Sequence, residues 1–99
     1  MKLLTEEIKR QLPSLYSTED VDVEDKIAIC KFFTPGSNWT WYAVEYDGED
    51  LFFGYVIGFV GEWGYFSLSE LESVRGALGL PIERDLYFDP QPIKPYLVE

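Results

Sequence analysis

Two runs of alternating apolar and aromatic residues, separated by a short acidic link, dominate the middle of the chain. The runs cover residues 39–46 and 51–60, and the link is Asp47-Gly48-Glu49-Asp50. Aromatic and β-branched residues favour pleated strands, and Asp-Gly tolerates the positive φ angles that a tight hairpin needs. The pattern therefore predicts an antiparallel hairpin with strands over residues 39–46 and 51–60.

Alternation divides the side chains of this predicted hairpin between two faces. A two-residue loop pairs Tyr46 with Glu49, and a four-residue loop pairs Tyr46 with Leu51. Either loop puts even positions of the first strand beside odd positions of the second. One face then carries Tyr42, Val44, Leu51, Phe53, Tyr55, Ile57 and Phe59. We expect this face to be the core and to pack against a helix.

The opposite face combines two indoles with two glycines. It carries Trp39, Trp41, Ala43, Glu45, Phe52, Gly54, Val56 and Gly58. Glycine weakens a strand unless another group needs the space that its missing side chain leaves. The tighter loop sets Trp41 opposite Gly54, and the looser one sets Trp39 opposite Gly58. The indoles then either shield bare backbone beneath another segment, such as the C-terminal tail, or form a shallow aromatic binding surface.

Capping signals predict a helix near each end of the chain. Thr5 is placed to cap a helix that Pro13 ends or kinks. The run Ser67-Leu68-Ser69-Glu70 has capping-box spacing, and Leu71, Val74 and Leu78 follow at helical spacing. We expect Gly76 or Gly79 to end this second helix.

Two further strands are expected beside the hairpin, over residues 27–33 and 65–68. The predicted fold is therefore α+β, an antiparallel β-meander of about four strands with two helices mainly on one face. A length of 99 residues predicts a single domain, 1–99, with a proline-rich C-terminal tail over residues 89–99. The spacing of Pro92 and Pro95 resembles a PxxP ligand, but we expect a tail that packs down on the domain.

Composition and charge narrow the classes of function. The chain has 18 acidic and 8 basic residues, a formal net charge of −10 and no histidine. The missing histidine excludes Ser-His-Asp and Cys-His catalysis and histidine-based zinc sites. A surplus of acid disfavours direct binding of nucleic acids or anionic membranes, which need clustered Lys and Arg, and suits a basic partner protein.

Cellular location and cofactors are constrained by what the sequence lacks. Cys30, the single cysteine, lies in an apolar run and is expected to be a small core residue. The acids of the N-terminal segment do not fit an export signal, and no apolar run approaches the roughly 18 residues of a membrane helix. We therefore expect a cytoplasmic protein that uses no cofactor.

The strongest charge cluster precedes the predicted sheet, at Glu19-Asp20-Val21-Asp22-Val23-Glu24-Asp25. It forms either a short edge strand or an exposed loop, because its valines alternate with acids that repel one another. A solvated segment that protects a sheet edge is one interpretation, and a docking strip for a basic partner is the other. Asp20, Asp22, Glu24 and Asp25, with Trp39 and Trp41, are our candidate partner-binding residues.

A second acidic group lies in the hairpin link. Asp47, Glu49 and Asp50 could serve a hard cation such as Mg²⁺ or Ca²⁺, although the twelve-residue calcium-loop pattern is missing. A solvated hairpin tip is the simpler interpretation. The GxxxxGK[ST] and GxGxxG patterns of phosphate-binding loops do not occur.

Four runs of the sequence resemble a known family: SNWTWY, DGEDLFFG, GYFSLSEL and LPIERDLYF. They are similar to a bacterial domain-of-unknown-function family, number 2958 in that series, and the resemblance extends from about Leu3 to Phe88. Members are small, single-domain proteins often encoded on plasmids, phages and integrative elements. The resemblance implies a mobile-element setting and no mechanism or catalytic residue.

We therefore expect a non-enzymatic module that binds a basic partner protein through acidic and aromatic surface. One version is a DNA mimic that blocks a host nuclease or regulator. The alternative is a small enzyme or metal-binding protein that uses Asp47, Glu49 and Asp50, and a third is an accessory component of plasmid maintenance.

Overall fold

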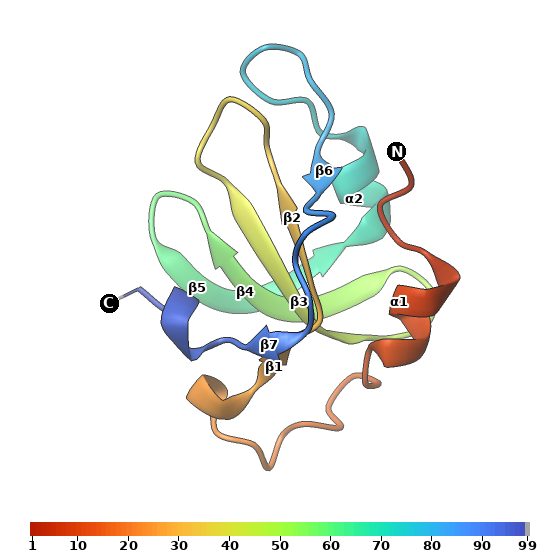
Figure 1. Ribbon diagram of the computed structural model, residues 1–99, viewed down its shortest axis with the longest axis vertical. Helices are drawn as coiled ribbons and strands as arrows, with labels where there is room; N and C mark the ends of the chain where they lie inside the picture. The colour runs from red at the N-terminus through yellow and green to blue at the C-terminus, as the bar shows by residue number, and fades with distance from the viewer. Residues whose placement is uncertain (99) are drawn as a thin grey trace.

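The computed structural model describes residues 1–98, and an antiparallel meander forms their centre (Figure 1). The meander consists of β2 (Cys30–Phe33), β3 (Thr40–Tyr46), β4 (Leu51–Ile57) and β5 (Gly61–Ser67). A short strand, β6 (Glu83–Arg84), pairs with the other edge of β2 and gives the order β5-β4-β3-β2-β6. A separate two-stranded sheet joins β1 (Ile27–Ala28) to β7 (Gln91–Pro92). The predicted α+β class is confirmed.

Both predicted helix caps are present. The Oγ1 atom of Thr5 accepts a hydrogen bond from the Ile8 amide at the start of α1 (Glu6–Gln11). The Oγ atom of Ser67 accepts one from the Glu70 amide at the start of α2 (Leu68–Ser73). Each cap satisfies an amide that the first helical turn leaves unpaired. Two single-turn 3₁₀ helices, η1 (Val23–Asp25) and η2 (Lys94–Tyr96), complete the described elements.

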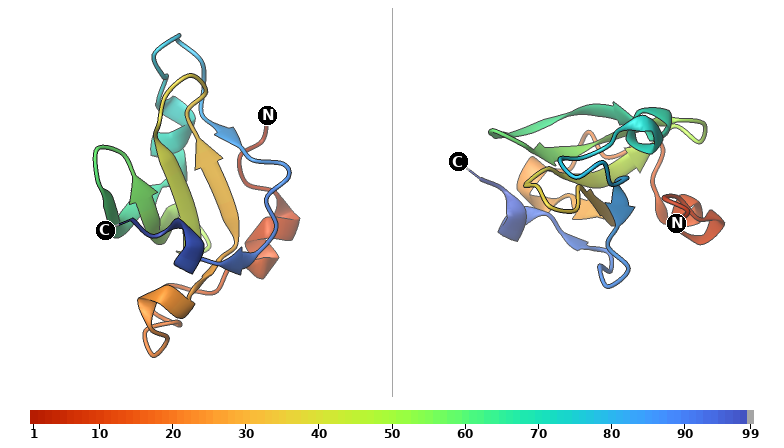
Figure 2. Two further views of the ribbon diagram at one scale, coloured as in Figure 1. Left: turned by 60° about the vertical axis from the view of Figure 1, so that its left-hand side comes forward. Right: turned by 90° about the horizontal axis from the view of Figure 1, so that it is seen from above.

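The sheet is buried on both faces. On one face, Leu4 and Leu12 flanking α1 and Leu71 of α2 pack with Phe52 and Phe66. On the other face, Ile93 of the C-terminal tail packs with Ala28, Tyr42 and Tyr55. Figure 2 shows the tail crossing the sheet on the side away from α2. The helices therefore lie mainly on one face, as predicted, and the packed-down tail covers the other.

This arrangement corrects the predicted core. We expected the Phe53 face to pack against the second helix, but the residue in the helix-covered core is Phe52, whose exposure is 0%. Phe53 is half-buried on the opposite face and Phe59 is 97% exposed. Alternation could not decide between the faces, because both strands carry apolar residues on both sides.

A β-bulge at Val44 corrects the predicted register. Tyr46 pairs with Phe52, so neither predicted hairpin loop is observed, but residues 40–43 keep the register that the four-residue loop predicts. Beyond the bulge the register shifts by one residue, and Tyr42 pairs with Tyr55. A bulge places two residues of one strand opposite one of its partner and redirects the side chains that follow. Glu45 is thereby moved from the face of Trp41 and Phe52, where alternation placed it, to the face that carries Phe53.

Several element ends also differ from the prediction. The second helix ends at Ser73, ahead of both glycines, because the chain leaves the helix to form an isolated bridge between Arg75 and Pro81. Leu78, predicted on the helix stripe, is exposed. The turn before β5 is closed by a hydrogen bond from the Gly58 amide to the Val60 carbonyl, so the strand begins at Gly61, earlier than the predicted residue 65.

The predicted strand over residues 27–33 is split between two sheets. Ile27 and Ala28 pair with the tail, whereas Cys30–Phe33 pairs with β3. The tail's own structure is β7 and η2, and residue 99 of the predicted 89–99 tail lies outside the described residues. The prolines 92 and 95 are therefore parts of a docked segment.

Candidate functional site

The acidic segment, residues 19–25, is an exposed turn that ends in η1, so the predicted edge strand is wrong and the predicted loop is observed. Its five carboxylates are Glu19, Asp20, Asp22, Glu24 and Asp25. All five are exposed, and within residues 1–98 none of them forms an ion pair with a basic side chain. The segment thus offers uncompensated negative charge to solvent.

A buried polar network holds the start of this segment against the sheet. The Glu45 side chain, 3% exposed, accepts hydrogen bonds from the Tyr16 amide at 2.8 Å and from the Thr18 amide and hydroxyl. The Nζ atom of Lys26, itself 6% exposed, donates to the Thr18 carbonyl and hydroxyl oxygens. Because buried charges are costly unless they are hydrogen-bonded, this network fixes the backbone of residues 16–18.

A small cavity opens beside this network, and we call it the tyrosine pocket. Its volume is about 250 Å³, and its lining residues are Tyr16, Glu19, Lys26, Glu45, Phe53 and Tyr65. Three of them form one row across three strands, because Tyr65 pairs with Phe53 and Phe53 pairs with Glu45. Tyr16 adds a second tyrosine from the loop before the acidic segment.

Two features mark the tyrosine pocket as unusual. Tyr16 has φ of 67°, the only positive φ of a residue other than glycine within residues 1–98. A bulky residue in this region is strained and is held there by its surroundings, here by the bond from its amide to Glu45. The neighbouring Tyr16 phenol raises the pKa of the Tyr65 phenol, although Tyr65 is 53% exposed.

Sequence reasoning missed this pocket. Alternation placed Glu45 on the face of Trp41 and Phe52, and only the bulge at Val44 brings it beside Phe53. The lysine that follows the acidic segment gave no signal of burial. The sequence offered one indirect clue, an isolated carboxylate within an apolar strand, which requires partners if it is buried.

The two predicted indoles line a different cavity, which we call the indole groove. Its volume is about 550 Å³, and it is lined by Thr34, Ser37, Trp39, Trp41, Val74, Arg75, Gly76 and Ala77. The Trp39 and Trp41 rings stack with centroids 6.0 Å apart. Trp41 faces the helix-covered core, whereas Trp39 remains 38% exposed.

Both predicted indole–glycine pairings can now be assessed. A side chain at Gly58 would lie 2.3 Å from the Trp39 ring, so the Trp39–Gly58 pairing is confirmed. Trp41 instead pairs with Val56, and the space at Gly54 is occupied by the Tyr42 carbonyl oxygen.

The acidic segment and the indole groove lie apart. The loop over residues 34–39 is at one end of the longest axis of the molecule and the acidic segment is at the other (Figure 1). That axis measures 40 Å. The predicted partner-binding residues therefore form two surfaces, and the surface that contains the acids adjoins the tyrosine pocket.

Two of the three carboxylates of the hairpin link, those of Asp47 and Asp50, have structural partners. Asp47 accepts hydrogen bonds from the amides of Glu49, Asp50 and Leu51, and these bonds hold the pKa of its carboxyl below the usual 3.8. Asp50 accepts bonds from the amide and hydroxyl of Ser69, which ties the hairpin to α2. Within residues 1–98, no group of three or more acidic or cysteine side chains is arranged to hold a metal ion.

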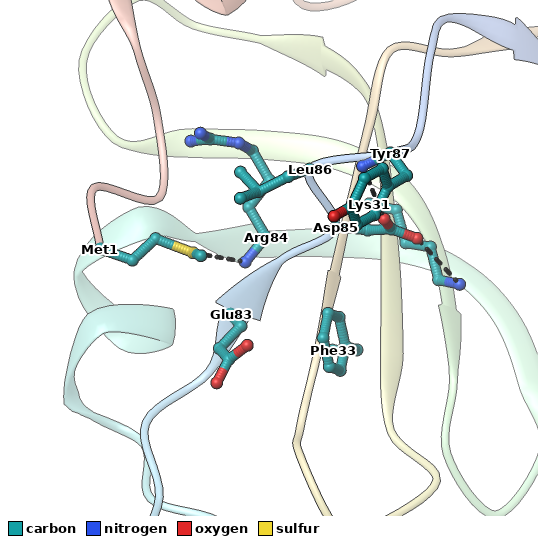
Figure 3. A pocket seen from close by; sticks show the side chains of 8 residues that line it. All are labelled: Met1, Lys31, Phe33, Glu83, Arg84, Asp85, Leu86 and Tyr87. Carbon is teal, nitrogen blue, oxygen red and sulfur yellow. Dashed lines mark hydrogen bonds and ion pairs between the residues drawn. The ribbon is translucent and has the colours of Figure 1, made fainter.

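A third cavity, of about 300 Å³, lies between the N-terminus and β6 (Figure 3). Three of its charged side chains are engaged within the chain. Lys31 pairs with Asp85 at 3.7 Å, and the Arg84 guanidinium donates to the carbonyl oxygens of Lys2 and Leu3. These contacts anchor the N-terminus on the sheet, and we assign this cavity no function.

Comparison with known proteins gives one match. The chain matches DUF2958, described as a protein of unknown function, over residues 3–98, which extends the predicted resemblance by ten residues into the docked tail. No curated protein and no solved structure gives a match. No helix within the described residues is long and apolar enough to cross a membrane. The chain therefore belongs to the DUF2958 family.

Proposed function

We propose that this protein is a non-enzymatic module that binds a basic partner protein, with the acidic segment as its main contact surface. The observation that carries the proposal is the exposure of all five carboxylates of residues 19–25 without an ion pair in the described chain. The net charge of −10 extends this attraction over the whole molecule. Charge of one sign on an exposed segment favours encounter with a partner of the opposite sign.

The charges should act mainly on the rate of association. Exposed carboxylates attract a partner over about one Debye length, near 8 Å at physiological ionic strength, and contribute little once the complex has formed. Trp39 offers a second contact, at the far end of the molecule, for a partner large enough to reach it. An indole that becomes buried in a complex acts through desolvated area and mainly slows dissociation.

Affinity capture from host lysate, followed by surface plasmon resonance on the recovered partner, tests the proposal. Replacing Asp20, Asp22 and Asp25 with asparagine should lower the association rate and flatten its salt dependence. A matched control replaces Glu6, Glu7 and Glu62, exposed acids outside the segment, with glutamine. If the two triple variants lowered the association rate equally, the acidic segment would contribute only through the net charge of the protein and would not be the contact surface.

The second contact has its own test. Trp39→Ala should raise the dissociation rate while circular dichroism shows an intact fold, because Trp39 is 38% exposed and packs at the rim of the sheet, against Gly58, Trp41 and Phe59. An unchanged dissociation rate would remove the indole groove from the interface. Unfolding of this variant would make Trp39 a structural residue.

A narrower form of the proposal is that the protein acts for a mobile genetic element in the host cytoplasm and imitates the charge of DNA. Five carboxylates within seven residues supply such charge at one end of the molecule. The partner would then be a DNA-binding protein, and duplex DNA would compete with this protein for it. Simultaneous binding of both to the recovered partner would reject DNA mimicry and leave the basic partner in place.

A further inference from the structure

We infer that the tyrosine pocket receives one basic side chain, a lysine or an arginine, from the partner protein. This inference rests on the proposed function and assigns it a specific recognition site. The pocket adjoins the acidic segment, because Glu19 belongs to both. A partner drawn to the acidic segment would therefore present its cationic side chains at the mouth of this cavity.

The charge balance of the pocket favours a cation. Two carboxylates, Glu19 and Glu45, line it together with one ammonium group, that of Lys26. Lys26 and Glu45 are both buried and engaged with residues 16–18, so Glu19 is the carboxylate that remains available to a ligand. The remaining surplus is negative, and the exposed acids that follow Glu19 add to it. An anionic ligand would have to overcome all of these charges.

The aromatic lining favours the same class of ligand. Phe53 and Tyr65 lie side by side with ring centroids 5.2 Å apart, and Tyr16 contributes a third ring. Aromatic faces attract ammonium and guanidinium groups, and the attraction grows when water is excluded. A cavity of about 250 Å³ accommodates one side chain but not a folded surface.

The pocket is built from two unusual backbone features, a β-bulge and a non-glycine residue with positive φ. The bulge at Val44 moves Glu45 onto the Phe53 face, and Glu45 in turn holds Tyr16 at a strained φ of 67°. Bulges are common where a strand must redirect a side chain toward a binding site, and backbone strain also gathers at such sites. Both features converge on this one cavity.

A titration with a short oligolysine peptide, followed by fluorescence anisotropy, tests the inference, with an oligoarginine peptide as a second probe. Tyr65→Leu should weaken binding about three- to tenfold, which is the range expected for loss of a cation–aromatic contact. Tyr87→Leu is the matched control, because Tyr87 is 94% exposed and lies outside the pocket. Glu19→Gln should weaken binding more than Glu62→Gln, although both remove one exposed charge.

A second measurement keeps the test independent of folding. Amide chemical shifts recorded during the peptide titration should change first around residues 16–19, 45, 53 and 65. Acetylation of the lysines of the oligolysine peptide should abolish these changes, because an acetylated lysine side chain carries no charge. If binding weakened only in proportion to the charge removed, and Tyr65→Leu and Tyr87→Leu bound the peptide equally well, the pocket would not be the binding site. The acidic segment would then remain as the contact surface. Shifts in the pocket caused by inorganic phosphate and not by either peptide would also overturn it.

Discussion

At the scale of single residues, the acidic side chains of this protein divide into two groups with different roles. Asp47 and Asp50 are engaged with backbone amides and a serine hydroxyl, and they hold the hairpin and α2 together. Glu45 is buried and fixes the loop before the acidic segment. The carboxylates of residues 19–25, by contrast, have no ion-pair partner in the described chain and are free to attract one.

The role of Asp47 predicts a dependence of stability on pH. Its folded pKa lies below the unfolded value of 3.8, so its stabilising effect is present above that value and is lost as the pH falls through the folded pKa. Asp47→Asn should therefore lower the free energy of unfolding at neutral pH and have little effect once the pH is below the folded pKa of Asp47. Urea unfolding at both pH values measures this difference. Glu49→Gln serves as the control, and an equal loss in that variant would contradict the role of Asp47.

Two adjacent phenylalanines test the assignment of the core. Phe52 is fully buried in the helix-covered cluster, so Phe52→Ala should cost about 3–5 kcal/mol, enough to unfold a marginal domain. Phe53 is only half-buried, beside the tyrosine pocket, and Phe53→Ala should cost clearly less. Thermal melts of the two variants provide the comparison. A greater loss for Phe53→Ala would show that the faces are exchanged.

At the scale of elements, the C-terminal tail acts as a structural layer of the fold. It supplies β7 to the two-stranded sheet, and the Ile93 amide donates to the Lys26 carbonyl. Further along, the Tyr96 ring stacks on Tyr42 at 4.9 Å, and the hydroxyl of Tyr55 exchanges hydrogen bonds with the backbone of Val98. The second face of the sheet would be bare without these contacts.

Ile93 provides the test of this layer. Its exposure is 0% among Ala28, Tyr42 and Tyr55, so Ile93→Ala should cost about 2–5 kcal/mol through lost burial and the cavity left behind. Lys94→Ala, one residue further on and exposed, should have little effect. Equilibrium unfolding in urea distinguishes the two. An Ile93→Ala variant as stable as the wild type would mean that the tail is only loosely attached.

At the scale of the whole molecule, charge determines what the protein can approach. The formal net charge is −10, and the described basic side chains are partly engaged, with Arg75 bonded to carbonyl oxygens at the end of α2 and Arg84 to the N-terminal backbone. Phosphate neutralisation needs clustered and available Lys and Arg. We therefore expect the protein as a whole to repel the nucleic acid backbone.

Duplex DNA gives the corresponding prediction. Fluorescence anisotropy with a labelled duplex at physiological salt should show no sub-micromolar binding, because the molecule carries 18 acids against 8 bases. A peptide rich in lysine, tested in the same buffer, is the positive control. Tight binding of the duplex that weakens steeply with salt would reveal a basic surface that the fold does not show.

The sequence by itself determined the local elements of this protein. Thr5 and Ser67 predicted both helix starts, because a capping hydroxyl and the amide it serves are three residues apart in the chain. The four-stranded meander followed from aromatic and β-branched runs separated by turn residues. The charge of residues 19–25 and their exposure also followed from composition, since adjacent like charges are not buried together.

Only the tertiary structure decided which face of the sheet meets the helices and where the tyrosine pocket lies. Both strands of the hairpin are apolar on both sides, so alternation did not distinguish the face that packs against the helices from the face that the C-terminal tail covers. The pocket depends on the bulge at Val44, on the burial of Lys26 and on a loop 29 residues away from Glu45 in sequence. A one-residue change in register exchanges the faces of every side chain that follows it, and long-range packing fixes that register.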